Sequence, residues 1–243
     1  MLAPVSKIQI PTVCHLCAES GEHDIPNLCS ACQTSIPYID NACECCAIPI
    51  GNDLNDLNKK STDGSRCANC TVNRPIYDTS LTVLHYQKPM DVLFNRLKHH
   101  RDITVAATFA NLLADKIIAS NTELPDIIVP IPLNWKRQLM RGFNHSQAIA
   151  AVLAGKLGIN LDTNVLTRVT NNAPQQGLTR AERLKNLDRC FEASKSVRNK
   201  KVALVDDVVT TGATMQAAAT ALYIRGTKSI SAWSVARTPD KTN

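Results

Sequence analysis

Two adjacent aspartates, Asp206 and Asp207, follow a short apolar run of the chain. Ionised carboxylates only accept hydrogen bonds, so the pair suits the vicinal hydroxyl groups O2′ and O3′ of a ribose. The loop after them carries small, hydroxyl-rich residues: Thr210, Thr211, Gly212, Ala213 and Thr214. Backbone N–H groups and hydroxyls gathered in this way bind an anion such as a 5′-phosphate. The residues therefore predict a site for a phosphorylated sugar.

The elements around these residues must place them at one edge of a sheet. The apolar run 202–205 is typical of a strand buried on both faces of a parallel sheet, and residues 213–223 have helical composition. We therefore expect the aspartates at the carboxyl end of a strand, where open α/β sheets bind ligands. The alternative is an ordinary strand, loop and helix with solvated aspartates. A P-loop is excluded because no Gly-Lys-Ser/Thr follows the glycine.

This order of an apolar strand, two acidic residues and a T-T-G-x-T loop resembles the phosphoribosyl diphosphate (PRPP) signature of type I phosphoribosyltransferases. The resemblance implies that the loop holds the 5′-phosphate of PRPP. It also implies that the two aspartates hold the ribose.

Composition sets broad limits on the protein. With 243 residues and 44% hydrophobic content, the chain can form one medium domain and a small one. It has no apolar run near 18 residues and no signal-peptide pattern, so we expect a cytoplasmic protein without a membrane span. Aromatic content is only 4%, and no arginine-aromatic interleaving suggests a stacking platform for single strands.

Charge divides unevenly along the chain. Residues 1–75 carry 5 Lys+Arg against 8 Asp+Glu, whereas residues 76–243 carry 22 against 13. The basic excess of the second part suits a polyphosphate ligand or a nucleic acid; a solvated basic face is the alternative. The acidic balance of the first part argues against a DNA-binding finger there.

Eight cysteines form four C-x2-C pairs near the start of the chain: Cys14/Cys17, Cys29/Cys32, Cys43/Cys46 and Cys67/Cys70. In a cytosolic protein this spacing indicates metal, and two pairs complete one tetrahedral site, so we expect two structural Zn²⁺ ions. We assign consecutive pairs to each site, giving two zinc ribbons. An interleaved arrangement of the same ligands is the alternative.

The remaining cysteines and the nearby histidines have no place in these sites. We treat Cys45 as a bystander, His15 and His23 as solvated loop histidines, and Cys190 as packed in an apolar environment. The Cys-rich segment has little apolar content, so zinc binding supplies its folding energy. Composition shifts near residues 74–75, which predicts a domain boundary there. We expect a double zinc-ribbon domain at 1–75 and, as the resemblance above implies, a phosphoribosyltransferase-like domain at 76–243.

Strands and helices alternate in the second part, which predicts an α/β fold with a parallel sheet flanked by helices. Further strands are expected at 79–86, 126–129 and 229–235. Further helices are expected at 89–99, 103–118 and 144–157.

Two further segments are candidates for ligand contact. The first is a basic loop, expected to hold the diphosphate with Mg²⁺, that contains Lys136, Arg137, Arg141, Gly142 and Asn144. A basic surface loop is the alternative. The second is a polar stretch leading into a helix from Gly177 to about Cys190, expected to close as a lid, with the residues Arg168, Gln176, Arg180 and Arg183.

Over nearly its whole length the chain resembles the ComF/GntX family, in which a zinc-ribbon head precedes a phosphoribosyltransferase domain. The matching motifs are the paired cysteines, 129–132 (VPIP), 141–144 (RGFN), 175–178 (QQGL) with Arg180 and Arg183, and the acidic pair. His145 departs from the family pattern, which continues with Gln. The resemblance implies PRPP binding and a cytoplasmic role in natural transformation or in the use of external DNA. Single-stranded DNA and DNA-uptake proteins are the partners that it implies.

Two functions from different classes fit these residues. One is an enzyme that transfers phosphoribosyl from PRPP to a nitrogenous acceptor and releases diphosphate. The other is a non-catalytic module that senses PRPP or a nucleotide and docks on single-stranded DNA or uptake proteins. The sequence identifies neither a general base nor the acceptor.

Overall fold

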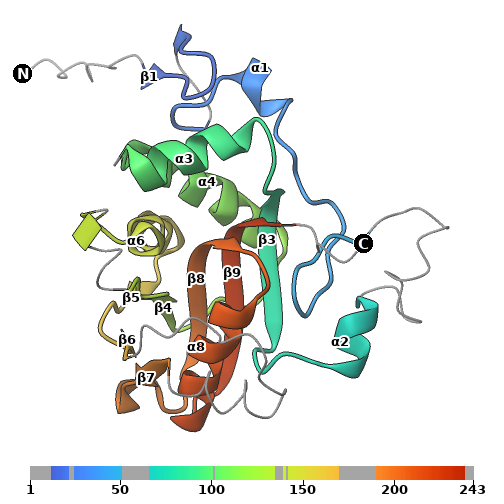
Figure 1. Cartoon of the computed structure of the whole chain (residues 1–243), viewed down its shortest axis with the longest axis vertical. Helices are drawn as coiled ribbons and strands as arrows, with labels where there is room; N and C mark the ends of the chain where they lie inside the picture. Colours follow the sequence, from blue (N-terminus) through green and yellow to red (C-terminus); the bar gives the residue numbers. More distant parts are fainter. Residues whose placement is uncertain are drawn as a thin grey trace, which may run out of the picture.

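A five-stranded parallel sheet forms the centre of the protein, in the order β3-β9-β8-β4-β5 (Figure 1). The computed structural model describes residues 12–21, 25–50, 66–100, 102–134, 139–140, 142–169 and 190–238. The strands are β3 (Thr79–His85), β4 (Ile127–Pro130), β5 (Asn160–Leu161), β8 (Lys201–Val209) and β9 (Ser229–Arg237). The predicted parallel α/β sheet is thus confirmed.

Four long helices cover the sheet, close to the predicted ranges. They are α3 (Met90–His99), α4 (Thr104–Ala119), α6 (His145–Leu157) and α8 (Ala213–Ile224). Helix α6 is capped at its start by Asn144, whose side chain accepts a hydrogen bond from the Gln147 N–H, and at its end by Gly158 in the left-handed conformation.

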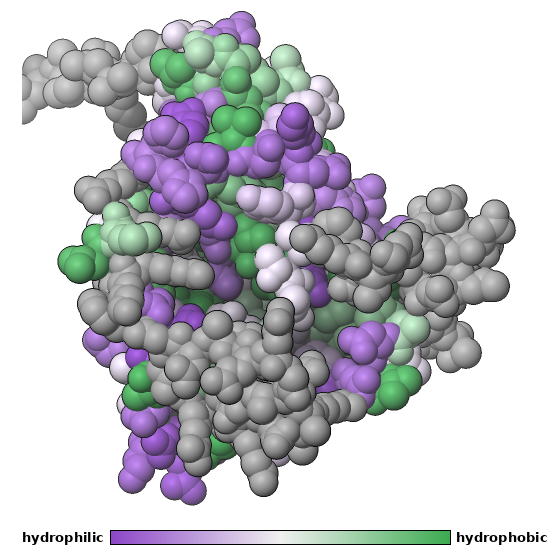
Figure 2. Space-filling model, viewed as in Figure 1, coloured by the Kyte–Doolittle hydropathy of each residue, from purple (hydrophilic) through white to green (hydrophobic). Residues whose placement is uncertain are grey.

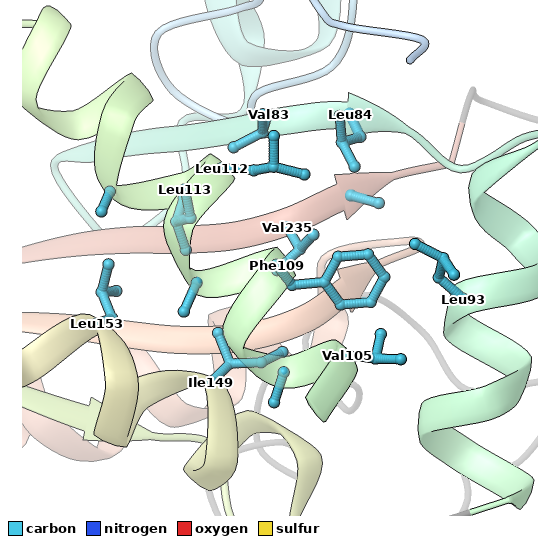
Figure 3. Close-up of a cluster of buried hydrophobic side chains, with 14 of the residues drawn as sticks. Val83, Leu84, Leu93, Val105, Phe109, Leu112, Leu113, Ile149, Leu153 and Val235 are labelled. Carbon is cyan, nitrogen blue, oxygen red and sulfur yellow. The ribbon is translucent and has the colours of Figure 1, made fainter. Parts of the chain in front are cut away.

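Both faces of the sheet are buried under helices. Because successive residues of a strand point to opposite sides, one strand contributes side chains to two cores. In β8, Ala203 and Val205 join a core with α3, α4 and α6, whereas Val202 and Leu204 join a second core with α8. Figure 3 shows the first core, where Phe109 of α4 lies among side chains from the other helices and from the sheet. This burial explains the uniformly apolar run 202–205 of the sequence.

Strand β8 runs four residues beyond its predicted end at Val205. It continues to Val209 because it pairs with β9 up to Arg237, while β4 on the other side ends at Pro130, opposite Val205. Asp206 and Asp207 therefore lie inside β8, in the part that extends beyond its shorter neighbour β4.

Within its described residues, the Cys-rich segment contains little regular structure. Its elements are β1 (Thr12–Val13), β2 (Ser20–Gly21), α1 (Ser30–Gln33) and α2 (Ala68–Val72). It packs directly on the sheet region: the Ile39 N–H donates to the Val83 carbonyl at 2.8 Å, and Cys14 and Cys29 belong to the first core. The division of the chain at residue 75 stays a prediction.

A short antiparallel pair, β6 (Leu166–Arg168) with β7 (Phe191–Ala193), was not expected from the sequence. A 3-10 turn, η1 (Lys195–Val197), follows. The pair joins the two ends of the predicted lid. Residues 177–189 of the helix expected there lie outside the described residues, and Cys190 lies in a turn. Among the helices that the structure describes, none has the length and apolar character to cross a membrane.

Candidate functional site

A pocket at the end of β8 is lined by Asp206 and by residues 208–215. It brings together one of the predicted ribose-binding aspartates and all five residues of the predicted phosphate loop. Asp207 lies beside it, with only 9% of its surface exposed.

The loop turns sharply at Gly212, which has a φ of 78° and immediately precedes α8. A residue with a side chain would be strained in this left-handed conformation. The Thr211 hydroxyl accepts a hydrogen bond from the Ala213 N–H at 3.3 Å, while Thr210, Thr211 and Thr214 are exposed. The arrangement places hydroxyls and the positive end of α8 at one point, where an anion is stabilised.

Arg237, at the end of β9, fixes the start of this loop. Its side chain is buried, and its Nη1 donates to the carbonyl groups of Val209 and Thr210. Arg237 is not among the site residues predicted from the sequence. Its only sequence signal is a charged residue directly after the apolar end of the last strand.

The two aspartates have different surroundings. Asp206 Oδ1 accepts hydrogen bonds from the Ser146 hydroxyl at 2.8 Å and from the Asp207 N–H at 2.9 Å. Burial of the carboxyl group and then the charge of Asp207 nevertheless raise the pKa of Asp206 to about 7. Asp206 can therefore change its protonation state near neutral pH.

Asp207 is paired with a cation. Its Oδ2 lies 3.0 Å from Lys98 Nζ, and its Oδ1 accepts from the Val208 N–H at 2.8 Å. Neither Lys98 nor Ser146 was a candidate from the sequence, because each lies far along the chain from the acidic pair, on α3 and α6.

Tyr77 lies beneath the phosphate loop. Its hydroxyl oxygen is 3.9 Å from the position that a Cβ on Gly212 would occupy, and the side chain is almost fully buried. Burial, followed by the charge of Cys46, raises the pKa of Tyr77. The tyrosine therefore stays protonated and lies near both the loop and Cys46.

The predicted diphosphate loop is described only in part. Lys136, Arg137 and Arg141 lie outside the described residues. Gly142 has a φ of 83°, and Asn144 is buried, with its Nδ2 donating to the Ile131 carbonyl at 2.9 Å. Together with its capping of α6, this contact makes Asn144 a fixed end point of the loop. The diphosphate contacts themselves stay a prediction.

Of the predicted lid residues, only Arg168 is described. It lies on β6, and its guanidinium carbon is 5.3 Å from the centre of the Phe191 ring on β7. Gln176, Arg180 and Arg183 lie outside the described residues. Arg168 therefore stands at the base of the predicted lid.

The eight paired cysteines form two clusters, with consecutive pairs together: Cys14, Cys17, Cys29 and Cys32, then Cys43, Cys46, Cys67 and Cys70. In each cluster all four sulfur atoms lie within 4.8 Å of one another. The Cys17–Cys29 and Cys46–Cys67 sulfurs are 3.6 Å and 3.7 Å apart, near the roughly 3.8 Å that four thiolates around one Zn²⁺ require. Both clusters could hold a zinc ion, and the consecutive arrangement is the one adopted.

The thiols of the second cluster differ in acidity. A hydrogen bond from the Cys46 thiol lowers the pKa of Cys43 to about 4, whereas the same hydrogen bond raises the pKa of Cys46 and burial raises that of Cys70. Cys45 is buried outside the cluster, consistent with its interpretation as a bystander, and Cys190 packs against the second core as expected.

The expectation that His15 is a solvated loop residue is wrong. Its ring lies against α4, with Nε2 3.1 Å from the Thr104 hydroxyl and Nδ1 3.4 Å from that of Thr108. Because the first cysteine cluster docks on α4, the ring is half-buried, and this burial lowers the pKa of His15. His23 lies outside the described residues, and His145 is buried, edge-on to the Phe143 ring.

A parallel sheet with an acidic pair and a threonine-lined loop at the end of a central strand defines a protein of the type I phosphoribosyltransferase class. The chain belongs to the phosphoribosyl transferase domain family, whose family model matches residues 106–243, and within it to the ComF type.

Relatives of similar length support this assignment. The chain is 30% identical over 235 residues to the DNA utilization protein YhgH of Salmonella typhi, covering 95% of this chain and 99% of the relative. It is 31% identical over 217 residues to Competence protein F of Haemophilus influenzae, covering 86% and 90% of the two chains.

Two solved structures are also similar. Glutamine PRPP amidotransferase from B. subtilis matches with a TM-score of 0.38 and 20% identity, over 54% of this chain and 26% of that chain. Purine phosphoribosyltransferase from Pyrococcus horikoshii matches with a TM-score of 0.33 and 19% identity, over 53% and 80% of the two chains.

Proposed function

We propose that this protein binds PRPP with Mg²⁺ and transfers its phosphoribosyl group to a nitrogenous acceptor. The observation that carries the proposal is the pocket in which Asp206 faces the loop 210–214. The loop would hold the 5′-phosphate, and Asp206 and Asp207 would hold the ribose hydroxyls. Mg²⁺ supplies positive charge to the diphosphate when bound.

In the proposed reaction, the bond between C1′ and the diphosphate oxygen breaks, and the electron pair leaves with the diphosphate. The acceptor nitrogen forms the new bond to C1′ and loses its proton to a base or to water. The protein contributes positioning and electrostatic stabilisation. The basic loop with Lys136, Arg137 and Arg141 would stabilise the diphosphate, and the segment with Gln176, Arg180 and Arg183 would exclude water.

The relatives are named for competence and for DNA utilization, so we place the activity in the handling of imported DNA in the cytoplasm. Single-stranded DNA and DNA-uptake proteins are the proposed partners. The two cysteine clusters would each hold one structural Zn²⁺, because four thiolates leave no open position for a substrate.

The test combines calorimetry and turnover on the zinc-loaded protein. PRPP with Mg²⁺ should give binding heat, and diphosphate should be released with one member of a set of purine, pyrimidine and amine acceptors. The double variant Asp206→Asn/Asp207→Asn should lose both signals. Glu192→Gln, an exposed carboxylate on β7, is the matched control and should keep both.

Other outcomes distinguish the alternatives. Heat without turnover, with DNA affinity that survives the double change, would favour the binding module over the enzyme. The absence of heat with the wild-type protein would contradict the proposed function altogether.

A further inference from the structure

Lys98, near the carboxyl-terminal end of α3, reaches the ribose-binding pair from outside the PRPP signature. Its Nζ lies 3.0 Å from Asp207 Oδ2, and the side chains of Lys98 and Asp207 are only 21% and 13% exposed. An ion pair shielded in this way interacts more strongly than one between solvated side chains. It also leaves an uncompensated charge if one partner is removed.

The path of the lysine side chain is fixed by aromatic rings. Its Nζ is 5.9 Å from the centre of the Tyr86 ring and 5.6 Å from that of Phe94. Ammonium groups are attracted to ring faces at these distances. Phe94 stacks on Phe109 of α4 with 4.4 Å between ring centres and belongs to the first core, whereas the Tyr86 ring lies at the surface.

The helix end that carries Lys98 is also held in place. Arg96, two residues earlier, donates from Nε to Asp102 Oδ2 at 3.1 Å and from Nη1 to the His15 carbonyl at 2.8 Å. Figure 1 shows α3 between the N-terminal Cys-rich segment and the sheet. In the same view, hydrophilic residues gather over the region of α3 (Figure 2). Helix α3 thus holds a cation at a fixed position beside the pocket.

The other aspartate is held differently. Asp206 accepts from the Ser146 hydroxyl, a neutral donor on α6 that is itself buried. Two neighbouring carboxylates repel each other, and the structure separates their roles by giving a cation to Asp207 and a hydroxyl to Asp206.

We propose that Lys98 is a positioning residue of the ribose-binding pair: its ammonium group holds the Asp207 carboxylate in place before the sugar binds. The proposal deepens the proposed function and rests on it for the identity of the sugar. Without the cation, repulsion between the two carboxylates would turn the Asp207 side chain away from Asp206. The two carboxylates would then no longer be arranged to accept hydrogen bonds from the sugar hydroxyls.

The first test requires no ligand. The Val208 N–H donates to Asp207 Oδ1, so its amide resonance reports the position of that carboxylate. In Lys98→Met, which keeps the apolar stem and removes the charge, the Val208 amide should shift in an NMR spectrum. Lys98→Arg should shift it much less. Lys195→Met, a change at an exposed lysine on η1, is the control and should leave it in place.

The second test measures binding of two ligands. Lys98→Met should bind PRPP with Mg²⁺ about tenfold more weakly, as expected when a charged partner of a buried group is lost, and Lys98→Arg should recover most of the affinity. Affinity for inorganic phosphate should stay unchanged, because the loop 210–214 is intact. A general loss of structure would instead weaken both ligands and lower the melting temperature.

The outcomes separate the two proposals. An unmoved Val208 amide in Lys98→Met would overturn the role of Lys98, as would PRPP affinity equal to that of the wild type. An equal loss for PRPP and phosphate would also overturn it. If the wild type binds no PRPP, the proposed function fails, whereas the Val208 resonance still decides whether Lys98 holds Asp207.

Discussion

The Ser146 hydroxyl donates a 2.8 Å hydrogen bond to Asp206 Oδ1, joining the start of α6 to the middle of the pocket. This bond favours the ionised carboxylate, while burial and the charge of Asp207 oppose it. The Ser146 hydroxyl and the Asp207 N–H are thus the two donors that stabilise the Asp206 anion.

Replacing this hydroxyl should make Asp206 harder to ionise. We expect Ser146→Ala to raise the pKa of Asp206 above its value of about 7 and to shift PRPP binding to higher pH. The loss of one buried hydrogen bond should lower the free energy of unfolding by about 1 kcal/mol. Carboxyl NMR titration and calorimetry at several pH values measure both effects. Ser196→Ala, at an exposed serine, should show neither.

Stability should depend on pH through Asp206. Its pKa is about 7 in the folded state and about 3.9 in the unfolded chain, so the folded state binds the extra proton in this interval. The contribution of Asp206 to the free energy of unfolding is thus fully present below about pH 4 and is lost as the pH rises through about 7.

The variant Asp206→Asn removes this titration. It should be more stable than the wild type at pH 8, by at least about 1 kcal/mol, with a smaller difference at pH 5. Urea unfolding at the two pH values measures the difference. A wild type that gains stability relative to the variant between pH 5 and 8 would contradict the assignment.

Metal content should follow the two cysteine clusters. We expect two zinc ions per chain by mass spectrometry, and one in Cys43→Ser, because a tetrahedral site with three thiolates binds zinc much more weakly. Cys45→Ala removes a buried neighbour outside the cluster and should retain both ions. Removal of zinc by a chelator should unfold the Cys-rich segment. If Cys43→Ser still contained two zinc ions, Cys43 would not be a zinc ligand.

The phosphate loop should depend on Arg237. In Arg237→Met the carbonyl groups of Val209 and Thr210 lose their buried donor, which should cost about 1 to 3 kcal/mol of stability. Affinity for inorganic phosphate should fall as the loop loses its fixed start. Arg237→Lys keeps the charge but has a single ammonium group, so it should be intermediate. If the wild type, Arg237→Met and Arg237→Lys bound phosphate equally well, Arg237 would not be needed to hold the loop.

The parts of the site that are contiguous in sequence were predictable. The chain 202–214 carries strand, acidic pair and loop in order, and the C-x2-C pairs bring their ligands together within single turns. Even so, the sequence predicts a strand end at Val205, because the polar Asp206 and Asp207 interrupt the apolar pattern. Pairing with the long strand β9 outweighs that local signal.

Contacts between distant parts of the chain could not be predicted. Lys98 lies at an ordinary polar position of an amphipathic helix, and Ser146 lies in the first turn of another. Only the way α3 and α6 pack on the sheet brings them to the aspartates. The strands β6 and β7 have three residues each, too few for a periodic pattern.

The matched family region begins at residue 106, yet β3 at 79–85 forms the edge of the sheet and pairs along most of β9. A fragment cut at residue 106 would expose the backbone of β9 together with the apolar side chains of Trp233 and Val235 that the first core now covers. A bare apolar edge strand pairs readily with other chains. Such a fragment would aggregate, and the phosphoribosyltransferase domain of this protein has to be expressed with the segment that precedes it.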